Sequence, residues 1–169
     1  FLGPQSLAGS PYIVAAELDD KGPESRILLA APLDLGDIER AFEDEIERED
    51  QVEWDPVARR VTARRRTRLG ALVLREEAIR EPDPQSVLAA LLAGIRAEGL
   101  EALPWSKAAR RLQHRVAFMR RFDPAFPEVS DDALLQNLEA WLGPHLYGKT
   151  AIADLDGLDL AGVLEGMLT

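Results

Sequence analysis

The hydrophobic periodicity of the chain changes at Glu81-Pro82-Asp83-Pro84, and this change decides more about the fold than any other part of the sequence. Before it, short apolar runs alternate with turn-forming residues, which is typical of strands. After it, apolar residues recur every three or four positions, which is typical of helices. Two prolines in four residues favour a boundary here. The sequence therefore predicts an α+β fold in two domains, a β-rich unit over residues 1–80 and a helical accessory domain over residues 81–169.

The β-rich unit is expected to contain two hairpins separated by an acidic helix. Residues 12–18 and 26–31 flank a turn-forming segment, so they predict the first hairpin. Apolar residues at helical spacing over residues 35–46 predict a short amphipathic helix. Residues 51–54 and 60–68, separated by an aspartate–proline turn, predict the second hairpin.

The strands that follow complete the predicted fold of this unit. Gly70 predicts a bend, and residues 71–74 should then continue as a more buried strand. About five strands in so short a unit predict a small OB-like β-barrel. The second domain is predicted to be an α-helical bundle. Its helices are expected over residues 85–98, 103–122, 130–142 and 154–168.

The composition limits the chemistry that this chain can perform. The sequence has no cysteine, which excludes disulfides, zinc ribbons and thiol catalysis. Its two histidines stand far apart without metal-ligand spacing, so we expect no metal site. No apolar run reaches the roughly 20 residues of a membrane span, and no signal peptide opens the chain. We therefore expect a cytoplasmic protein with no membrane partner, and the first residue, Phe rather than Met, indicates a piece of a longer one.

Opposite charges are separated along the chain, although the net charge is −10. Eleven acidic residues lie from Asp34 to Asp55, and seven arginines without an acid lie from Arg59 to Arg75. Strand alternation over residues 60–68 would align four arginines on one face. Because the guanidinium fork suits phosphate, we predict that this face contacts a nucleic-acid backbone; its residues are Arg60, Arg64, Arg66 and Arg68. The alternative left open is that the acidic helix neutralises these arginines within the domain.

A second basic surface is expected on the helix over residues 103–122. Phe118 falls within the face opposite the apolar stripe of this helix, where an aromatic residue has no core to fill. Phe118 would stack on a base, and Arg111 would contact a phosphate. The alternative is a solvated helix face with Phe118 covered by a neighbouring part of the domain. The basic residues of this face are Lys107, Arg110, Arg111, His114 and Arg121.

Residues 143–150 read GPHLYGKT and match the phosphate-binding pattern G-x-x-x-x-G-K-[ST]. Such a loop follows a buried strand and opens a helix, whereas here a helix is predicted directly before it. We therefore interpret the match as chance. The alternative, a stand-alone P-loop nucleotidase, would require magnesium-dependent ATP binding that Lys149→Ala abolishes. No nucleophile motif or spaced carboxylate pair points to catalysis elsewhere, so we expect no enzymatic activity and no cofactor in this chain alone.

Five blocks of the sequence occur in an order that resembles a helicase family. They are PYIVAAELD, RILLAAPLD, VEWDPVARRVTARRRTRLGALVLRE, LPWSKAARRLQHRVAFMRR and SDDALLQNLEAWLGPHLYG. Together they cover nearly the whole chain and resemble the C-terminal region of the HrpB family of bacterial ATP-dependent helicases, of the DEAH/RHA-like class. The motor motifs of that family, including Walker A and DEAH, are absent from this sequence, so no catalytic residue carries over.

The resemblance implies an accessory region of a DEAH-box helicase whose ATP and magnesium bind in two upstream motor domains. The implied partners are single-stranded RNA or DNA and the motor domains of the same chain. We therefore expect this region to guide a single strand beside the motor or to dock on the motor. The rival hypothesis is a protein-interaction module in which the acidic helix and the arginine face bind partner domains.

Overall fold

A computed structural model describes residues 7, 9–19, 22 and 25–168, and it confirms the α+β class. Contacts divide the chain into two compact units: Phe1–Glu49 with Arg65–Glu77, and Asp50–Arg64 with Ala78–Thr169. The domain boundary predicted between residues 80 and 81 stays a prediction. The division by contacts additionally groups Asp50–Arg64 with the helical part of the chain.

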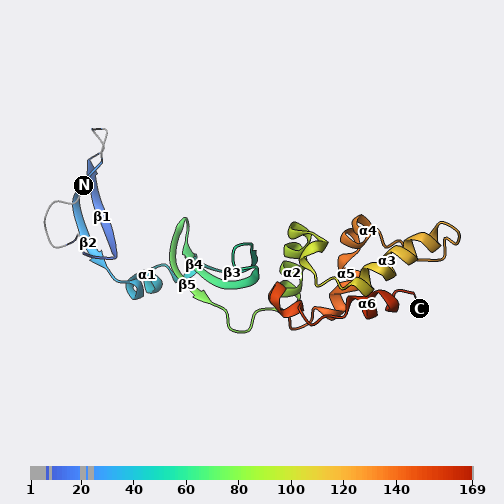
Figure 1. The fold of residues 1–169 in the computed structure, drawn as a ribbon. Helices are drawn as coiled ribbons and strands as arrows, with labels where there is room; N and C mark the ends of the chain where they lie inside the picture. The colour runs from blue at the N-terminus through green and yellow to red at the C-terminus, as the bar shows by residue number, and fades with distance from the viewer. Residues whose placement is uncertain (1–6, 8, 20–21, 23–24, 169) are drawn as a thin grey trace. The chain divides into compact units, whose positions relative to one another are not determined.

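Strands β1 (Tyr12–Asp19) and β2 (Arg26–Leu33) of the first unit form the predicted antiparallel hairpin (Figure 1). Most of the turn predicted between them lies outside the described residues. The hydroxyl of Tyr12 donates a 3.3 Å hydrogen bond to the carbonyl oxygen of Leu74. This bond ties the hairpin to the strand that contains Leu74.

The acidic segment is helical only at its start. Helix α1 (Leu35–Ala41) begins with a capping box, in which a carboxylate oxygen of Asp34 accepts a 2.7 Å hydrogen bond from the N–H of Asp37. The helix is followed by η1 (Glu43–Glu45) and strand β3 (Ile46–Asp55). The predicted acidic helix is therefore too long, because the last apolar residue of its helical pattern also fits the alternation of the strand that begins there.

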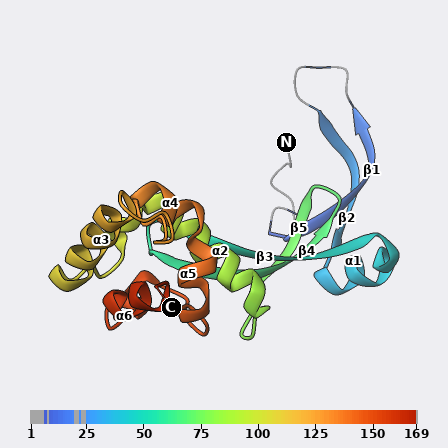
Figure 2. The same cartoon turned by 90° about the vertical axis from the view of Figure 1, so that its right-hand side faces the viewer.

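Among the described residues the strands form two separate sheets rather than the closed OB-like barrel that we predicted. One sheet is the β1-β2 hairpin, and the other has the order β3-β4-β5 (Figure 2). A barrel requires one sheet that closes on itself, and α1 separates the two sheets along the chain. Strands β4 (Arg60–Leu69) and β5 (Leu72–Ala78) are joined by a tight turn, in which Gly70 adopts a φ of +56° that favours glycine.

Apolar side chains of the first unit are buried at few positions. Ile38 and Leu74 are 4% and 7% exposed. Leu72 and Val73, which we expected in a more buried strand, are 46% and 45% exposed. That prediction was therefore wrong for these two residues, and within residues 72–74 only Leu74 is buried.

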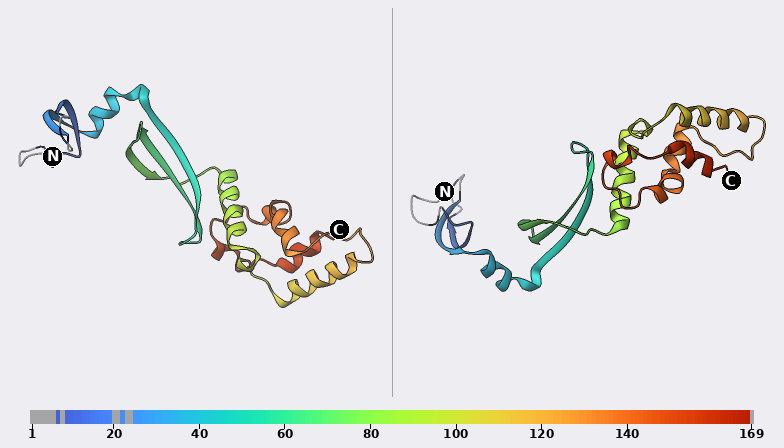
Figure 3. Two further views of the ribbon diagram at one scale, coloured as in Figure 1. Left: turned by 90° about the horizontal axis from the view of Figure 1, so that it is seen from above. Right: turned by 60° about the horizontal axis from the view of Figure 1, so that its bottom comes forward.

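Helices of the second unit enclose an apolar core that includes Leu91, Ile95, Leu138 and Leu142. Helix α3 packs on α6, and α2 packs on α5 (Figure 3). The first two predicted helices are confirmed, and the third is interrupted at Asn137. In place of the fourth predicted helix, the chain forms two short, separate helical segments. The elements are α2 (Pro84–Glu98), η2 (Leu100–Ala102), α3 (Lys107–Arg120), α4 (Asp131–Gln136), α5 (Leu138–Leu142), η3 (Gly143–His145), η4 (Ile152–Leu155) and α6 (Leu160–Gly166).

The indole of Trp54 packs closely against helix α2 at Gly94. A Cβ atom on residue 94 would lie 2.2 Å from Cδ2 of Trp54, far inside the normal contact distance. Trp54 also packs against the core of the second unit. Glycine at position 94 therefore allows residues 50–64 to pack on the helical core.

Candidate nucleic-acid interface

Burial along strand β4 follows the expected alternation only in part, because Arg65 is exposed although it shares the side of Val61 and Thr67. Val61 and Thr67 point to its buried side and are only 7% and 5% exposed. The arginines of the opposite side are Arg60, Arg64, Arg66 and Arg68. The first two are exposed and the last two are half-buried. The arginines are therefore brought onto one face, but their surroundings differ along the strand.

Arginines of the first unit lie beside carboxylates of neighbouring elements. Nε of Arg66 is 2.7 Å from a carboxylate oxygen of Glu76 in β5. Nη1 of Arg68 is 4.0 Å from Glu49 in β3, and Nη2 of Arg75 is 3.4 Å from Glu39 in α1. The neutralisation that we considered is therefore present for these arginines. The acidic helix supplies the partner of Arg75, whereas Arg66 and Arg68 pair with acids of the sheet.

Arginines of the second unit surround a hollow of about 410 Å³ that we call the arginine hollow. It lies between the start of β4, the segment that links β5 to α2, and the start of α2. Three of the described residues that line it are arginines, and neither an aspartate nor a glutamate is among the described lining residues. The lining residues are Arg60, Val61, Thr62, Ala63, Arg64, Ala78, Ile79, Arg80, Pro82, Val87 and Thr150.

Asp55 contributes negative charge near this hollow, although it does not line it. Its Oδ1 accepts hydrogen bonds of 3.0 Å and 2.9 Å from the N–H groups of Ala58 and Val57. These two bonds, and then the positive charges of Arg64 and Arg60, hold the pKa of Asp55 below its ordinary value. The carboxylate is therefore ionised near neutral pH, and one of its oxygens is occupied by the turn.

Helix α3 carries the second predicted surface in altered form. Arg111 and Phe118 are exposed, and Phe118 makes an edge-to-face contact with Phe122 at a centroid distance of 5.1 Å. Arg110, which we assigned to the basic face, instead lies 3.9 Å from the ring centroid of Trp105 and 3.1 Å from Asp131. A cation over an indole is attracted to the ring, so Arg110 is held inside the unit and the basic face is smaller than predicted.

The segment over residues 143–150 does not have the geometry of a phosphate loop. Helix α5 precedes it, the first three residues of the segment form the helical turn η3, and an isolated antiparallel bridge between Ala151 and Arg60 follows it. A carboxylate oxygen of Asp154 accepts hydrogen bonds of 2.9 Å and 3.0 Å from the N–H groups of Thr150 and Ala151. The first of these bonds is the main cause that lowers the pKa of Asp154. The N–H of Thr150, the last residue of the pattern, is thus already bound within the unit.

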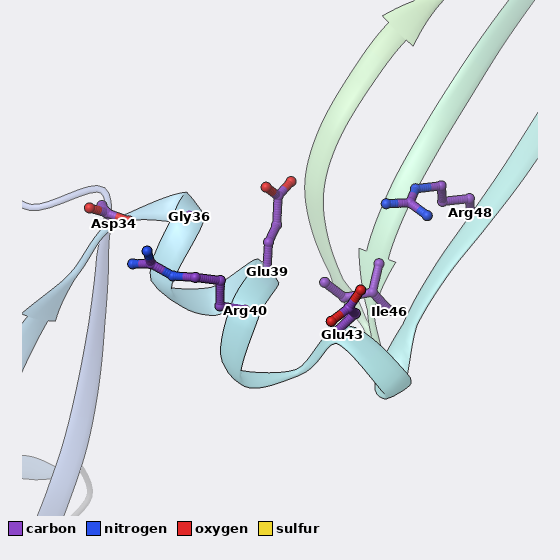
Figure 4. Close-up of a pocket in the computed structure, with 7 residues that line it drawn as sticks. All are labelled: Asp34, Gly36, Glu39, Arg40, Glu43, Ile46 and Arg48. Atoms are coloured by element: carbon purple, nitrogen blue, oxygen red, sulfur yellow. The ribbon is translucent and has the colours of Figure 1, made fainter.

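A further hollow, of about 530 Å³, lies in the first unit and has mixed charge. Its lining side chains come from α1, η1 and the start of β3 (Figure 4). Acidic Asp34, Glu39 and Glu43 stand beside Arg40 and Arg48 there. Because both signs are present, this hollow favours neither an anion nor a cation.

The described residues hold neither a recognisable metal centre nor a membrane span. No group of three or more His, Cys, Asp or Glu side chains among them is arranged to hold a metal ion. No described helix is both long enough and apolar enough to cross a bilayer. Several carboxylates instead cap backbone N–H groups, as Asp34, Asp83 and Asp154 do.

Sequence reasoning missed Arg80, the third arginine of the hollow. Its segment was interpreted only as a boundary, and 16 positions separate it from Arg64. The N–H of Ile79 donates a 3.0 Å hydrogen bond to the carbonyl oxygen of Ala63, which brings the two segments together. This pairing is between residues distant in sequence, and the only local signal was an arginine beside a proline-rich break.

This chain is similar in sequence and in structure to known helicases of one family. Residues 45–79 match the family described as ATP-dependent RNA helicase HrpB, connector region. The chain is 33% identical over 148 residues to the ATP-dependent RNA helicase HrpB of Escherichia coli (strain K12), across 86% of this chain and 18% of that protein.

Two solved structures are also similar to this chain. The crystal structure of the E. coli DExH-box NTPase HrpB has a TM-score of 0.53 and 30% identity, over 98% of this chain and 21% of that one. The crystal structure of the E. coli DEAH/RHA helicase HrpB has a TM-score of 0.52 and 33% identity, over 74% of this chain and 16% of that one.

The family match contains all four arginines that the sequence singled out on β4, because it runs from residue 45 to residue 79. The chain spans less than a fifth of the length of its E. coli relative. The resemblance seen in the sequence is confirmed, and the chain belongs to the HrpB family as a segment that contains the connector region.

Proposed function

We propose that this chain is an accessory region of an ATP-dependent RNA helicase of the cytoplasm, and that it contacts single-stranded nucleic acid beside the motor domains. ATP hydrolysis with magnesium would occur in those motor domains, and this region would itself perform no catalysis. The relatives described above support the helicase parent. The observation that carries the nucleic-acid contact is that Arg60 and Arg64 are both exposed and line the same hollow.

The arginines of β4 suit a polyanionic backbone better than a single small anion. Alternate residues of a strand are roughly 6.6 Å apart, so successive guanidinium groups reach along a ligand rather than to one point. Each guanidinium offers donors in a planar fork that matches phosphate oxygens. A single strand held in this way would be bound with little sequence preference and with a strong dependence on salt.

Arg66 and Arg68 are also proposed to contact phosphate, but we expect them to contribute less to the binding affinity. Their contacts with Glu76 and Glu49 would have to be exchanged for contacts with phosphate. Arg111 and Phe118 on α3 would add a phosphate contact and a stacking surface, because both side chains are exposed.

A second function, docking on another protein domain, is favoured by the exposed apolar side chains of the first unit. Leu18, Leu28 and Leu29 are 54%, 58% and 58% exposed. Leu28 and Leu29 follow each other in β2, so exposed leucines stand on both faces of the hairpin, and exposed apolar surface commonly marks protein contacts. The motor domains of the same helicase are the proposed partner, because most of the relative's length lies outside this chain.

The test is a fluorescence-anisotropy titration of this chain with labelled single-stranded RNA and DNA at two salt concentrations. Three variants are compared: Arg60→Ala/Arg64→Ala, Arg66→Ala/Arg68→Ala, and all four together. We expect salt-dependent binding that falls most in the first pair, with circular dichroism unchanged. If the wild-type chain does not bind either strand at low salt, the nucleic-acid proposal is wrong and docking becomes the leading function.

A further inference from the structure

The arginine hollow concentrates positive charge in a chain whose net charge is −10. Arg60, Arg64 and Arg80 contribute three guanidinium groups to it. Within the described part of the chain, neither Arg60 nor Arg80 has a carboxylate at salt-bridge distance, and both are exposed. A hollow lined by one sign of charge attracts ligands of the opposite sign more strongly than a flat surface does. The ligand expected here is therefore an anion.

The guanidinium groups of Arg60 and Arg80 are also donors that remain available in this hollow. The hydroxyl of Thr62 lies 3.4 Å from the carbonyl oxygen of Glu53, and that of Thr150 lies 3.4 Å from a carboxylate oxygen of Asp154. Both hydroxyl groups thus face acceptors within the unit. Arginine forks bind phosphate oxygens through paired N–H donors, so phosphate is the favoured anion.

Apolar residues also line the hollow. They are Val61, Ile79, Pro82 and Val87, together with two alanines. Its volume of about 410 Å³ lies in the range of pockets that hold small organic ligands. An inorganic phosphate would leave these apolar residues uncovered, whereas a base or ribose attached to the phosphate could contact them.

Backbone pairing holds the walls of the hollow in place before any ligand binds. The N–H of Val61 donates a 2.7 Å hydrogen bond to the carbonyl oxygen of Thr150, and the N–H of Ile152 donates one of 3.2 Å to that of Arg59. The segment that matched a phosphate loop therefore serves as a wall of this hollow. A pre-formed site loses less free energy on ordering when it binds.

We propose that the arginine hollow binds one nucleoside phosphate, with its phosphate on Arg60, Arg64 and Arg80 and its base or sugar against Ile79, Pro82 and Val87. This inference rests on the proposed contact with nucleic acid and deepens it, because it adds Arg80 and an apolar wall to the arginines of β4. The nucleoside phosphate belongs either to one position of a single strand or to a free nucleotide.

Arg80→Ala is the informative variant, because Arg80 lines the hollow but does not belong to strand β4. The matched control is Arg96→Ala, an exposed arginine of α2 that does not line the hollow. Labelled single-stranded RNA and a fluorescent ATP analogue are each titrated by anisotropy over a series of salt concentrations. Lys149→Ala is titrated with the ATP analogue as well.

For a strand in the hollow, we expect Arg80→Ala to weaken RNA binding about tenfold, as the loss of a charged hydrogen bond would. The slope of log K against log salt should fall by about 0.7, the share of one phosphate contact on a single strand. Arg96→Ala should change the affinity less than twofold. A merely structural effect of Arg80 would not lower the salt slope, and circular dichroism would register it.

The remaining outcomes separate this inference from the proposed function. If the four β4 substitutions abolish RNA binding but Arg80→Ala does not change it, the hollow is wrong and the arginine strand stands. If only the ATP analogue binds and Arg80→Ala weakens it, the hollow stands with a free nucleotide and the strand contact is wrong. Loss of ATP-analogue binding in Lys149→Ala but not in Arg80→Ala would overturn the hollow in favour of a phosphate loop. Binding of neither ligand would overturn both proposals.

Discussion

Replacement of Gly94 by alanine should destabilise the second unit because the added methyl group has no room. A Cβ atom at this position would lie 2.2, 2.5 and 2.6 Å from Cδ2, Cε2 and Cε3 of Trp54. Carbon atoms are in favourable contact at about 3.5–4.0 Å, so the helix or the indole must move by more than about 1 Å. A rigid ring that packs against the core cannot yield as a flexible side chain would.

The expected size of the effect follows from two opposing contributions. Overpacking of a core costs about 1–3 kcal/mol, and overlap with three ring atoms favours the upper end of this range. Alanine has a higher helix propensity than glycine by about 1 kcal/mol. We therefore expect Gly94→Ala to lower the free energy of unfolding by about 2 kcal/mol. In a chain of this length the melting temperature should fall by roughly 4–8 °C.

Urea denaturation followed by far-ultraviolet circular dichroism measures this difference. The matched control is Gly166→Ala at the end of α6, where an added Cβ would meet no atom within 4 Å; its stability should be unchanged or slightly higher. In a Trp54→Leu background, where the clashing indole is absent, Gly94→Ala should become neutral or stabilising. An equal cost of Gly94→Ala in both backgrounds, or no cost in the wild type, would refute the close approach of Trp54 to α2.

Three further predictions concern the second unit. Ser106→Ala should lower its stability by about 1 kcal/mol in urea denaturation, because the Ser106 hydroxyl accepts a 3.0 Å hydrogen bond from the N–H of Ala109 at the start of α3. Gln113→Leu should cost about 1–3 kcal/mol in the same assay, since buried Gln113 donates to the carbonyl oxygen of Val129 at 2.9 Å and leucine would leave that oxygen unpaired. The pKa of Asp154 is lowered by its backbone N–H donors, so its stabilising contribution is present above its ordinary pKa of 3.8 and is lost as the pH falls through the lower folded-state value. The stability difference between wild type and Asp154→Ala should therefore be clear at neutral pH and shrink in acid, and a difference that persists in acid would contradict this.

Local signals in the sequence predicted the helices of the second unit well. Asp83, Ser106 and Ser130 are polar residues directly before apolar periodic runs, and each accepts a hydrogen bond from the first turn of its helix. Capping depends on residues three positions apart, so a single sequence is enough to recognise it. The break at Asn137 was missed because the apolar spacing continues across it.

The arrangement of the strands could not be predicted in the same way. Both hairpins have local turn signals, and both are present. Closure of a barrel depends on hydrogen bonds between strands that are distant in sequence, and the pattern of residues within each strand carries no information about them. The exposure of Leu72 and Val73 could not be predicted either, since it depends on which distant segments cover the faces of the sheet, whereas Leu74 of the same strand is buried.

The sequence predicted which strand contributes arginines to the candidate site, but it did not predict the other segments that line the site. Alternation predicts that four arginines share one face of β4, yet it treats all four as equivalent, whereas two are exposed and two are half-buried. Their difference arises from neighbouring segments, because Arg66 lies beside Glu76 of β5 whereas Arg60 and Arg64 lie beside the segment that contains Arg80.

The affinity that an arginine adds for phosphate depends on which contacts its guanidinium group must give up when phosphate binds. An arginine that already contacts a carboxylate must give up that contact, so much of the gain from phosphate is offset. Arg66 is in this position, with Glu76 at 2.7 Å. Arg80 has no carboxylate at salt-bridge distance among the described residues, and its binding would add contacts without removing any. Arg66 and Arg80 thus differ in what phosphate binding would cost, and the difference follows the acids on neighbouring segments rather than the arginines themselves.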